Sequence, residues 1–210
     1  MIPLRLSPIH VRVGIALGGL AWGAAVVAGF TWLNDYANSA GGARTAPAAW
    51  PAESTLPRAA DGATLLLFAH PRCPCSRATL GELSSLLAHA PNRCQVCVAI
   101  LAPAAAEPSW WQSDLWEQAR AIPGVRVLAD RDGLEAQRFG ALTSGHALLY
   151  DSAGKLAFSG GITSGRGHSG DNAGRSAIES LLLAGDSAIR ATPIFGCPIS
   201  TPCPPSPTHR

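Results

Sequence analysis

The sequence predicts an α/β protein with a central mixed sheet flanked by helices, preceded by one helix that can span a membrane. Three observations support this prediction. Short apolar runs alternate with segments of helical periodicity after residue 61, which is typical of a sheet whose core strands are parallel. A turn at residues 151–154 joins the last two apolar runs into an antiparallel hairpin. Residues 13–33 are almost continuously apolar and contain no ionisable side chain.

The composition fits one domain with additional segments. The chain has 210 residues, of which 14% are charged, whereas roughly 25% is usual in soluble domains. Part of this imbalance lies in the apolar segment. The formal net charge of +2 gives no support for a nucleic-acid partner, and we expect none.

The apolar segment at residues 13–33 predicts a transmembrane helix, because about 20 such residues cross a bilayer. Arg5 and Arg12 precede it and the next basic residue is Arg44, so the positive-inside rule places residues 1–12 in the cytoplasm. The rest of the chain then lies in the periplasm, on the outer face of a bacterial cytoplasmic membrane. The alternative is a cleaved signal peptide, although its apolar core is usually shorter, about 7–15 residues.

The remainder of the chain divides into three parts by composition. Residues 34–60 are rich in Ala, Gly, Pro and Ser and are expected to form a linker that holds the domain off the membrane. Residues 61–190 carry the alternating apolar and helical patterns and are expected to fold as the domain. Residues 191–210 form a tail rich in proline and cysteine, which the sequence alone does not place.

The elements of the domain follow from hydrophobic periodicity and from helix and turn signals. Ser76 can cap a helix, and Leu80, Leu83 and Leu87 then recur at helical spacing. The expected strands are 64–70, 95–101, 125–128, 146–150 and 156–159, and the expected helices are 76–89, 108–122, 134–139 and 176–183. Residues 160–174 form a glycine-rich loop that lacks the Gly-Lys-Ser/Thr of a phosphate-binding loop.

Cys73-Pro74-Cys75 stands at the junction between the first strand and its helix. Backbone N–H groups and the positive end of a helix dipole meet at such a junction and favour a thiolate over a thiol. The thiolate is the form that attacks disulfides and binds metals. We therefore predict a redox pair in which Cys73 attacks and Cys75 resolves, joined by a strained, easily reduced bridge. The alternative is a pair of buried or permanently bridged cysteines.

Two histidines extend this site in a metal-binding alternative. His70 precedes Cys73 by three residues, and His146 begins the strand that we expect beside the cysteine loop. Two thiolates and two imidazoles suit copper or zinc. Taken alone, each histidine is more simply explained as a structural residue, one in a loop and the other hydrogen-bonded in a strand.

The other four cysteines are expected to be structural. Cys94 and Cys97 sit where a loop leads into the second strand, and side chains three residues apart on a strand face opposite ways. A structural disulfide or a core position for Cys97 is therefore the simpler explanation. Cys197 and Cys203 are expected to form a local disulfide, the alternative being a tail that delivers a third thiol to the cysteine loop. All six cysteines follow residue 72, which agrees with an extracytoplasmic location.

The chain resembles the thioredoxin-like superfamily over residues 61–185. The segment Phe68-Ala69-His70-Pro71-Arg72-Cys73-Pro74-Cys75 stands where those proteins carry aromatic-Ala-x-Trp-Cys-x-x-Cys, and the turn at residues 151–155 is similar to their hairpin turn. The chain also resembles a group of membrane-anchored RedB-type thioredoxin-like proteins. The segments that carry this second resemblance are His70-Pro71-Arg72-Cys73-Pro74-Cys75-Ser76-Arg77, Gly160-Gly161-Ile162-Thr163, Arg166-Gly167-His168 and Thr192-Pro193-Ile194-Phe195-Gly196-Cys197-Pro198.

The sequence departs from the superfamily pattern in three ways. The cysteines are spaced C-x-C instead of C-x-x-C, and Arg72 takes the usual place of the first cysteine if Cys75 is aligned with the second. The superfamily's cis-proline before the fourth strand is missing, and Thr143-Ser144-Gly145-His146 stands there. That proline normally shields the disulfide and orients partner peptides, so its absence keeps alternatives to protein disulfide exchange open.

The resemblance implies a thioredoxin-like fold and a membrane-anchored thiol–disulfide oxidoreductase. Cys73 and Cys75 would act on a redox partner or on a client protein that contains cysteine. The first alternative is a copper- or zinc-binding assembly protein that uses the same cysteines with His70 or His146. The second is a thioredoxin-like interaction domain without turnover.

Overall fold

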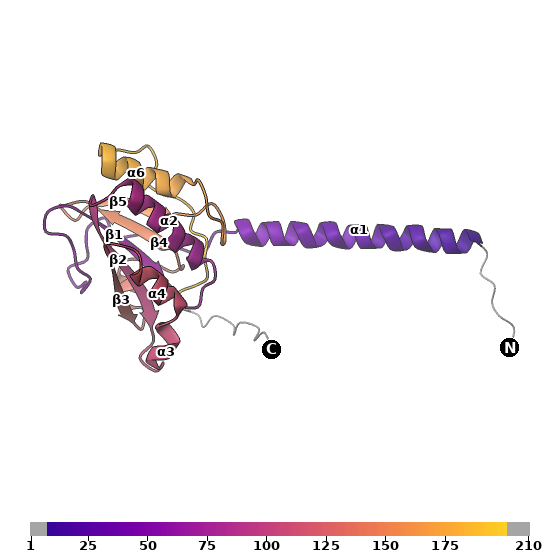
Figure 1. Ribbon diagram of the computed structural model, residues 1–210, viewed down its shortest axis with the longest axis horizontal. Coiled ribbons are helices and arrows are strands. Elements are labelled where there is room, and N and C mark those ends of the chain that lie inside the picture. Colours follow the sequence, from indigo (N-terminus) through magenta and orange to yellow (C-terminus); the bar gives the residue numbers. More distant parts are fainter. Residues whose placement is uncertain (1–7, 201–210) are drawn as a thin grey trace. The chain divides into compact units, whose positions relative to one another are not determined.

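The computed structural model describes residues 8–200, which divide into two compact units between residues 37 and 38 (Figure 1). Helix α1, Pro8–Asn38, forms the described part of the first unit up to residue 37, and it contains the span predicted at residues 13–33. Its 31 residues correspond to roughly 46 Å of helix, more than the roughly 30 Å of a bilayer core. None of the residues of α1 is buried, and α1 is apolar enough to cross a membrane.

The second unit is built on one five-stranded mixed sheet with the strand order β3-β2-β1-β4-β5. The strands are β1 (Ala63–Ala69), β2 (Cys94–Ala102), β3 (Val125–Arg131), β4 (His146–Tyr150) and β5 (Leu156–Gly161). The first three are parallel, whereas β4 runs antiparallel to both β1 and β5. The parallel core and the final hairpin confirm the predicted thioredoxin-like fold, a mixed sheet flanked by helices.

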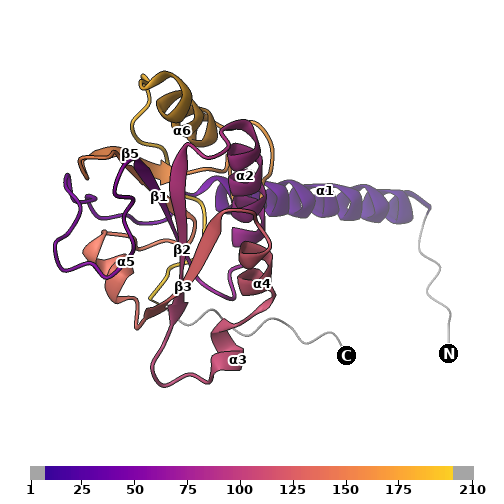
Figure 2. The same cartoon turned by 60° about the vertical axis from the view of Figure 1, so that its left-hand side comes forward.

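Helices cover both faces of this sheet (Figure 2). They are α2 (Ser76–His89), α3 (Pro108–Trp111), α4 (Asp114–Arg120), α5 (Leu134–Arg138) and α6 (Ala173–Ala184). One face packs against α2, α4 and α6 through a core that includes Leu67, Leu83 and Ile178. The opposite face packs against α5 through Phe68 and Ala136. Because side chains alternate along a strand, central strand β1 supplies both cores.

The helix expected at residues 108–122 is two short helices, α3 and α4, so its continuity was wrongly predicted. Ser113 between them is extended, and its hydroxyl donates to the carbonyl of Pro71 at 2.9 Å. This hydrogen bond ties the break to the cysteine loop. The other elements agree with expectation apart from small shifts at their ends. Helix α6 begins earlier than expected because Asn172 caps it, its side chain accepting from the N–H of Arg175 at 2.8 Å.

Residues 34–60 were expected to be a linker, but the part of this segment that follows α1 lies against the domain. Trp50 contacts the rings of Phe139 and Tyr150 edge-on, at centroid distances of 5.1 and 5.3 Å. Ser54 donates to the carboxylate of Glu135 at 2.7 Å. These contacts cover part of the sheet face that carries α5. The Ala- and Pro-rich composition suggested a spacer, but isolated apolar residues such as Trp50 provide enough surface for packing.

Candidate functional site

The cysteine loop, residues 70–75, connects the buried end of β1 to α2. The N–H of Cys73 donates to the carbonyl of His70, and the N–H of Ser76 donates to the carbonyl of Cys73, both at 3.1 Å. The residue before the first turn of α2 is Cys75, which makes no side-chain cap. The predicted capping role of Ser76 was therefore wrong, because its hydroxyl is hydrogen-bonded to that of Ser144 at 2.7 Å.

Ser144 joins the cysteine loop to the segment that leads into β4. Its hydroxyl accepts a hydrogen bond from the N–H of His70 at 2.8 Å, and only 1% of the residue is exposed. No peptide bond between residues 8 and 200 is cis. A serine hydroxyl thus links the two segments at the position where the superfamily resemblance implies a cis-proline.

A third cysteine, Cys197, lies beside Cys73. It belongs to residues 191–199, which we call the docked tail because they pair with the rest of the domain. The N–H of Ser144 donates to the carbonyl of Cys197 at 2.8 Å, and Thr143 and Pro198 form an antiparallel bridge. The N–H of Cys197 in turn donates to Sγ of Cys73 at 3.4 Å. The docked tail therefore delivers a third thiol to the loop, while Cys203 lies outside the described residues.

Hydrogen bonds hold the pKa of Cys73 far below that of an ordinary thiol. The largest contribution comes from the side chain of Cys197, followed by that of Cys75, with smaller ones from Ser76 and the N–H of Cys197. Burial opposes this shift, since only 2% of Cys73 is exposed, but the hydrogen bonds prevail. The hydrogen bonds from Cys75, Ser76 and the docked tail thus favour the thiolate form of Cys73.

Cys75 is half-buried, and its pKa is shifted upward. The largest single effect, the hydrogen bond with Cys197, lowers this pKa. The hydrogen bond with Cys73, burial and the charge of Cys73 raise it, and together they outweigh the effect of Cys197. The nearby positive charge of Arg166 lowers it slightly. The pKa values of the two cysteines of the motif are therefore shifted in opposite directions, downward for Cys73 and upward for Cys75.

Cys94 and Cys97 lie in β2, on opposite faces of the sheet, and both are free thiols. Cys97 is fully buried, which confirms the core position considered for it. Burial raises the pKa of Cys94 to about 11 and that of Cys97 to about 12. Neither is activated, and no disulfide joins them.

His70 is fully buried next to the cysteines. Its Nδ1 accepts from the N–H of Arg72 at 3.1 Å, while its Nε2 has no hydrogen-bond partner. Burial chiefly lowers its pKa, against an opposing effect of the charge on Cys73. Trp110 meets the imidazole edge-on at 5.5 Å and carries the guanidinium of Arg72 over its ring at 5.1 Å. Trp110 therefore helps to fix the start of the loop.

His146 points away from the cysteines. It shares one face of β4 with Leu148 and Tyr150, which belong to the core on the side opposite α2. Its Nε2 is hydrogen-bonded to the hydroxyl of Ser159 at 2.9 Å, and burial lowers its pKa to about 4. The structure thus brings Cys73, Cys75 and His70 together without His146. Within residues 8–200, no group of three or more His, Cys, Asp or Glu side chains is arranged to hold a metal ion.

The glycine-rich loop between β5 and α6 borders the same site. Glu82 of α2 fixes it, because its buried carboxylate accepts from the N–H of Gly170 at 2.7 Å and pairs with Arg175 at 2.9 Å. Earlier in the loop, Arg166 donates to the carbonyl of Gly196, directly before Cys197. The loop thus supplies a cation beside Cys75 and a contact to the docked tail.

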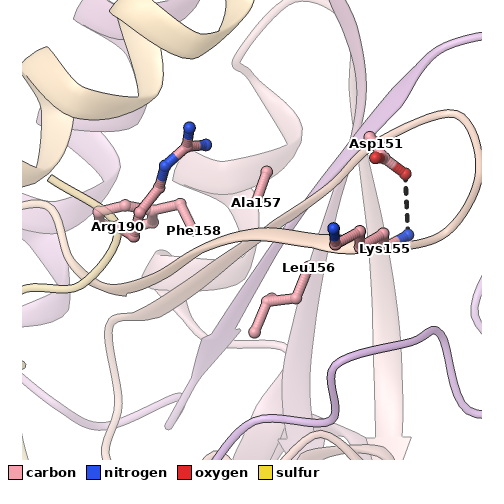
Figure 3. A pocket seen from close by; sticks show the side chains of 6 residues that line it. All are labelled: Asp151, Lys155, Leu156, Ala157, Phe158 and Arg190. Atoms are coloured by element: carbon pink, nitrogen blue, oxygen red, sulfur yellow. Dashed lines mark hydrogen bonds between the residues drawn. The ribbon is translucent and has the colours of Figure 1, made fainter. Parts of the chain in front are cut away.

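A separate pocket of about 370 Å³ lies at the β4–β5 hairpin. Figure 3 shows its lining side chains, which are those of Asp151, Lys155, Leu156, Ala157, Phe158 and Arg190. The N–H of Lys155 donates to the carboxylate of Asp151 at 2.8 Å and stabilises the turn. No cysteine lines this pocket, so it is distinct from the thiol cluster.

Solved structures share the fold of this chain. One is a hypothetical protein from Sinorhizobium meliloti, with 20% identity, a TM-score of 0.58 and coverage of 75% of this chain and 96% of that chain. Another is an uncharacterized conserved protein from Geobacillus kaustophilus, with 18% identity, a TM-score of 0.55 and coverage of 80% and 95%. No protein-family model and no curated protein matches the sequence. At such identities the likeness concerns the fold alone.

Sequence reasoning missed Ser144 and Trp110 as residues that fix the loop. It also preferred a local disulfide of Cys197 with Cys203 to a place for Cys197 at the cysteine loop. The isolated apolar residues Ile194 and Ile199, each 4% exposed, are the signal that the tail packs. Gly196 is a second signal, because glycine permits the close approach of two backbones.

Proposed function

We propose that this chain is a thiol–disulfide oxidoreductase in which Cys73 is the attacking thiol. The observation that carries the proposal is the set of hydrogen bonds to its sulfur from Cys197, Cys75 and Ser76, which favours the thiolate. The thiolate is the nucleophile in disulfide exchange. The contrast with Cys97, whose pKa is raised to about 12, supports Cys73 as the reactive cysteine.

The reaction is a two-step exchange with a disulfide of a client or redox partner. The Cys73 thiolate attacks one sulfur of that disulfide, forming a mixed disulfide and releasing the other sulfur as a thiolate. A second thiol of the cluster, Cys75 or Cys197, then loses its proton and attacks Sγ of Cys73. The partner leaves as a dithiol, and its two electrons come from the two cysteine thiols of this chain. The reverse sequence would oxidise a dithiol.

We further propose that α1 anchors the domain on the outer face of a bacterial cytoplasmic membrane. The support is the length and apolar composition of α1 together with Arg5 and Arg12 before the apolar segment. The resemblance to membrane-anchored RedB-type proteins agrees with this location. An oxidising compartment also suits a chain with six cysteines.

Copper or zinc binding by the same thiols stays a prediction. His70 lies at the cluster with a buried Nε2 that has no hydrogen-bond partner, whereas His146 faces the other side of the sheet. A metal site that uses the thiols and His70 would require these side chains to rearrange, because within residues 8–200 no three of them are arranged to hold a metal ion. Measuring the copper and zinc content of the reduced protein, together with the redox titration, tests this alternative.

A redox titration tests the proposal. Full-length protein in detergent is equilibrated with dithiol buffers of stepped potential, and the remaining thiols are alkylated and counted by mass. We expect two thiols to be lost together at one potential, an unchanged titration in Cys97→Ser, and no intramolecular bridge at the loop in Cys73→Ser. If the thiol count does not change across the range, or if the transition persists in Cys73→Ser, the proposal is wrong. Tight stoichiometric copper or zinc binding that His70→Ala weakens would favour the metal alternative.

A further inference from the structure

The docked tail is held by several separate contacts. The N–H of Ile199 donates to the carbonyl of Leu142 at 2.8 Å, and the N–H of Gly41 donates to the carbonyl of Ile194 at 2.7 Å. Ile194 and Ile199 bury their side chains on either side of Cys197. The position of Cys197 is therefore set by packing on both sides of it.

Close backbone contact brings the docked tail onto the loop before β4. A Cβ atom on Gly196 would overlap the carbonyl oxygen of Ser144, and one on Gly161 would come within 2.6 Å of the carbonyl oxygen of Pro193. Real Cβ atoms avoid such contacts, so glycine is required at both positions for this approach. The close approach at these glycines thus lets the N–H of Cys197 donate a hydrogen bond to Sγ of Cys73.

We propose that Cys197 is the resolving cysteine of the site, forming a disulfide with Cys73 after Cys73 has reacted with a client disulfide. This inference rests on the proposed function and names the second thiol of that reaction. Its observations are the 3.4 Å hydrogen bond from Cys197 N–H to Cys73 Sγ and the pairing that holds the docked tail beside the cysteine loop. The side chain of Cys197 is also hydrogen-bonded to that of Cys73, so the two sulfurs already face each other, and a disulfide requires them to close to about 2 Å.

The alternative partner, Cys75, is constrained by the turn that it occupies. The N–H of Ser76 is bonded to the carbonyl of Cys73, and Cys75 itself is helical, with φ −66° and ψ −26°. The side chains of Cys73 and Cys75 are hydrogen-bonded to each other, but both cysteines belong to this single turn. A Cys73–Cys75 bridge would have to distort the start of α2, whereas Cys197 approaches from an independent segment.

The burial of Cys73 gives the order of events. Because 2% of Cys73 is exposed, the docked tail must move aside before a client disulfide can reach it. Cys73 then forms a mixed disulfide with one client sulfur and releases the other as a thiolate. When the tail returns, the thiolate of Cys197 attacks Sγ of Cys73 and expels the second client sulfur. The client gains two electrons, which Cys73 and Cys197 lose as their disulfide forms. Of the two protons that the client sulfurs take up, one comes from Cys197 and one from solvent, because Cys73 is already deprotonated.

The test uses reduced full-length protein in detergent, with oxidised glutathione as the probe disulfide. The reaction is quenched with acid, the thiols are alkylated, and the disulfide-linked peptides are mapped. Wild-type protein should yield a Cys73–Cys197 bridge. Cys197→Ser should accumulate the Cys73–glutathione mixed disulfide. It should release the second glutathione at least about tenfold more slowly than the wild type, because the pre-positioned thiol is lost. Cys94→Ser, a matched thiol loss outside the cluster, should behave as the wild type.

The outcomes separate this inference from the proposed function. A wild-type bridge between Cys73 and Cys75, or between Cys197 and Cys203, with unchanged resolution in Cys197→Ser, would overturn the role of Cys197 and leave disulfide exchange intact. Absence of any glutathione adduct or bridge at Cys73 in every variant would overturn both. If the Cys197→Ser variant folds poorly, the disulfide-linked peptides of the wild-type protein still show whether Cys73 is bridged to Cys197.

Discussion

Cys73 and Cys97 show how the same side chain acquires opposite properties. Both are almost fully buried, which by itself disfavours the charged thiolate. Cys97 lies among apolar side chains, and its pKa rises to about 12. Cys73 accepts hydrogen bonds from two segments of the chain, the start of α2 and the docked tail, and its pKa falls. The donors, more than the helix end that the sequence pointed to, distinguish the reactive residue.

The lowered pKa of Cys73 sets the sign of its pH dependence. In the unfolded chain the pKa of a cysteine thiol is about 8.5. In the folded protein the thiolate persists below that pH, so nucleophilic reactivity at Cys73 should be retained as the pH falls toward neutrality. The stabilisation of the fold by this thiolate is fully present above the unfolded pKa and is lost only as the pH falls through the lower, folded pKa.

At the scale of elements, the docked tail depends on Gly196. Gly196→Ala should lower the free energy of unfolding by about 1–3 kcal/mol, because the new methyl group overlaps the Ser144 carbonyl and the tail must shift. Urea unfolding of the full-length protein in detergent, followed by tryptophan fluorescence, measures this loss. Trypsin cleavage after Arg190 should also become faster.

Gly42→Ala is the matched control for this prediction. Gly42 is exposed, and the nearest atom to an added Cβ is 4.0 Å away, in the side chain of Leu142. The control should leave unfolding and cleavage unchanged. If Gly196→Ala behaves like Gly42→Ala, the tail is not docked as tightly as the structure indicates.

Most elements were predictable because their signals are local. The apolar run in β1, the leucines of α2 and the turn before β5 each reflect residues close together in the chain. The break between α3 and α4 was not predictable, because it is fixed by the bond from Ser113 to Pro71, which no helical periodicity encodes.

The site was predictable in part for the same reason. Cys73 and Cys75 are marked by their place between a strand and a helix. Cys197 joins them through pairing with residues 142–144, and long-range contacts of this kind leave no local pattern. His146 was placed near the cysteines because β4 adjoins β1. That prediction was wrong because side chains alternate along β4, and the side chain of His146 points to the face opposite the cysteines.

At the scale of the molecule, residues 38–61 and the docked tail both lie against the sheet of the second unit. The N–H of Gly41 bonds to Ile194, and the hydroxyl of Thr143 donates to the carbonyl of Gly42 at 2.6 Å. The segment after α1 and the docked tail therefore meet beside the loop that holds the cysteines. The packed part of the chain begins soon after α1 ends at Asn38, so residues 38–61 act as part of the domain.

The proposed topology predicts the behaviour of a reporter fusion. Alkaline phosphatase, which is active only outside the cytoplasm, is joined after residue 40. We expect activity in the membrane fraction, because Arg5 and Arg12 retain the N-terminus in the cytoplasm. The same fusion without residues 13–33 should be inactive. An inactive full fusion would refute the orientation, and release of a mature chain that lacks the first 40 residues would identify a signal peptide.

The central claim is that Cys73 is a thiolate at neutral pH, and its ultraviolet thiolate absorbance tests this most directly. The absorbance of reduced full-length protein in detergent is titrated with pH, and that of Cys73→Ser is subtracted, with Cys97→Ser as the control. The hydrogen bonds to Sγ of Cys73 predict a difference that is complete at neutral pH and persists in mild acid, while Cys97→Ser matches the wild type. A difference that emerges only near pH 8.5, about the value for a free thiol, would contradict the account.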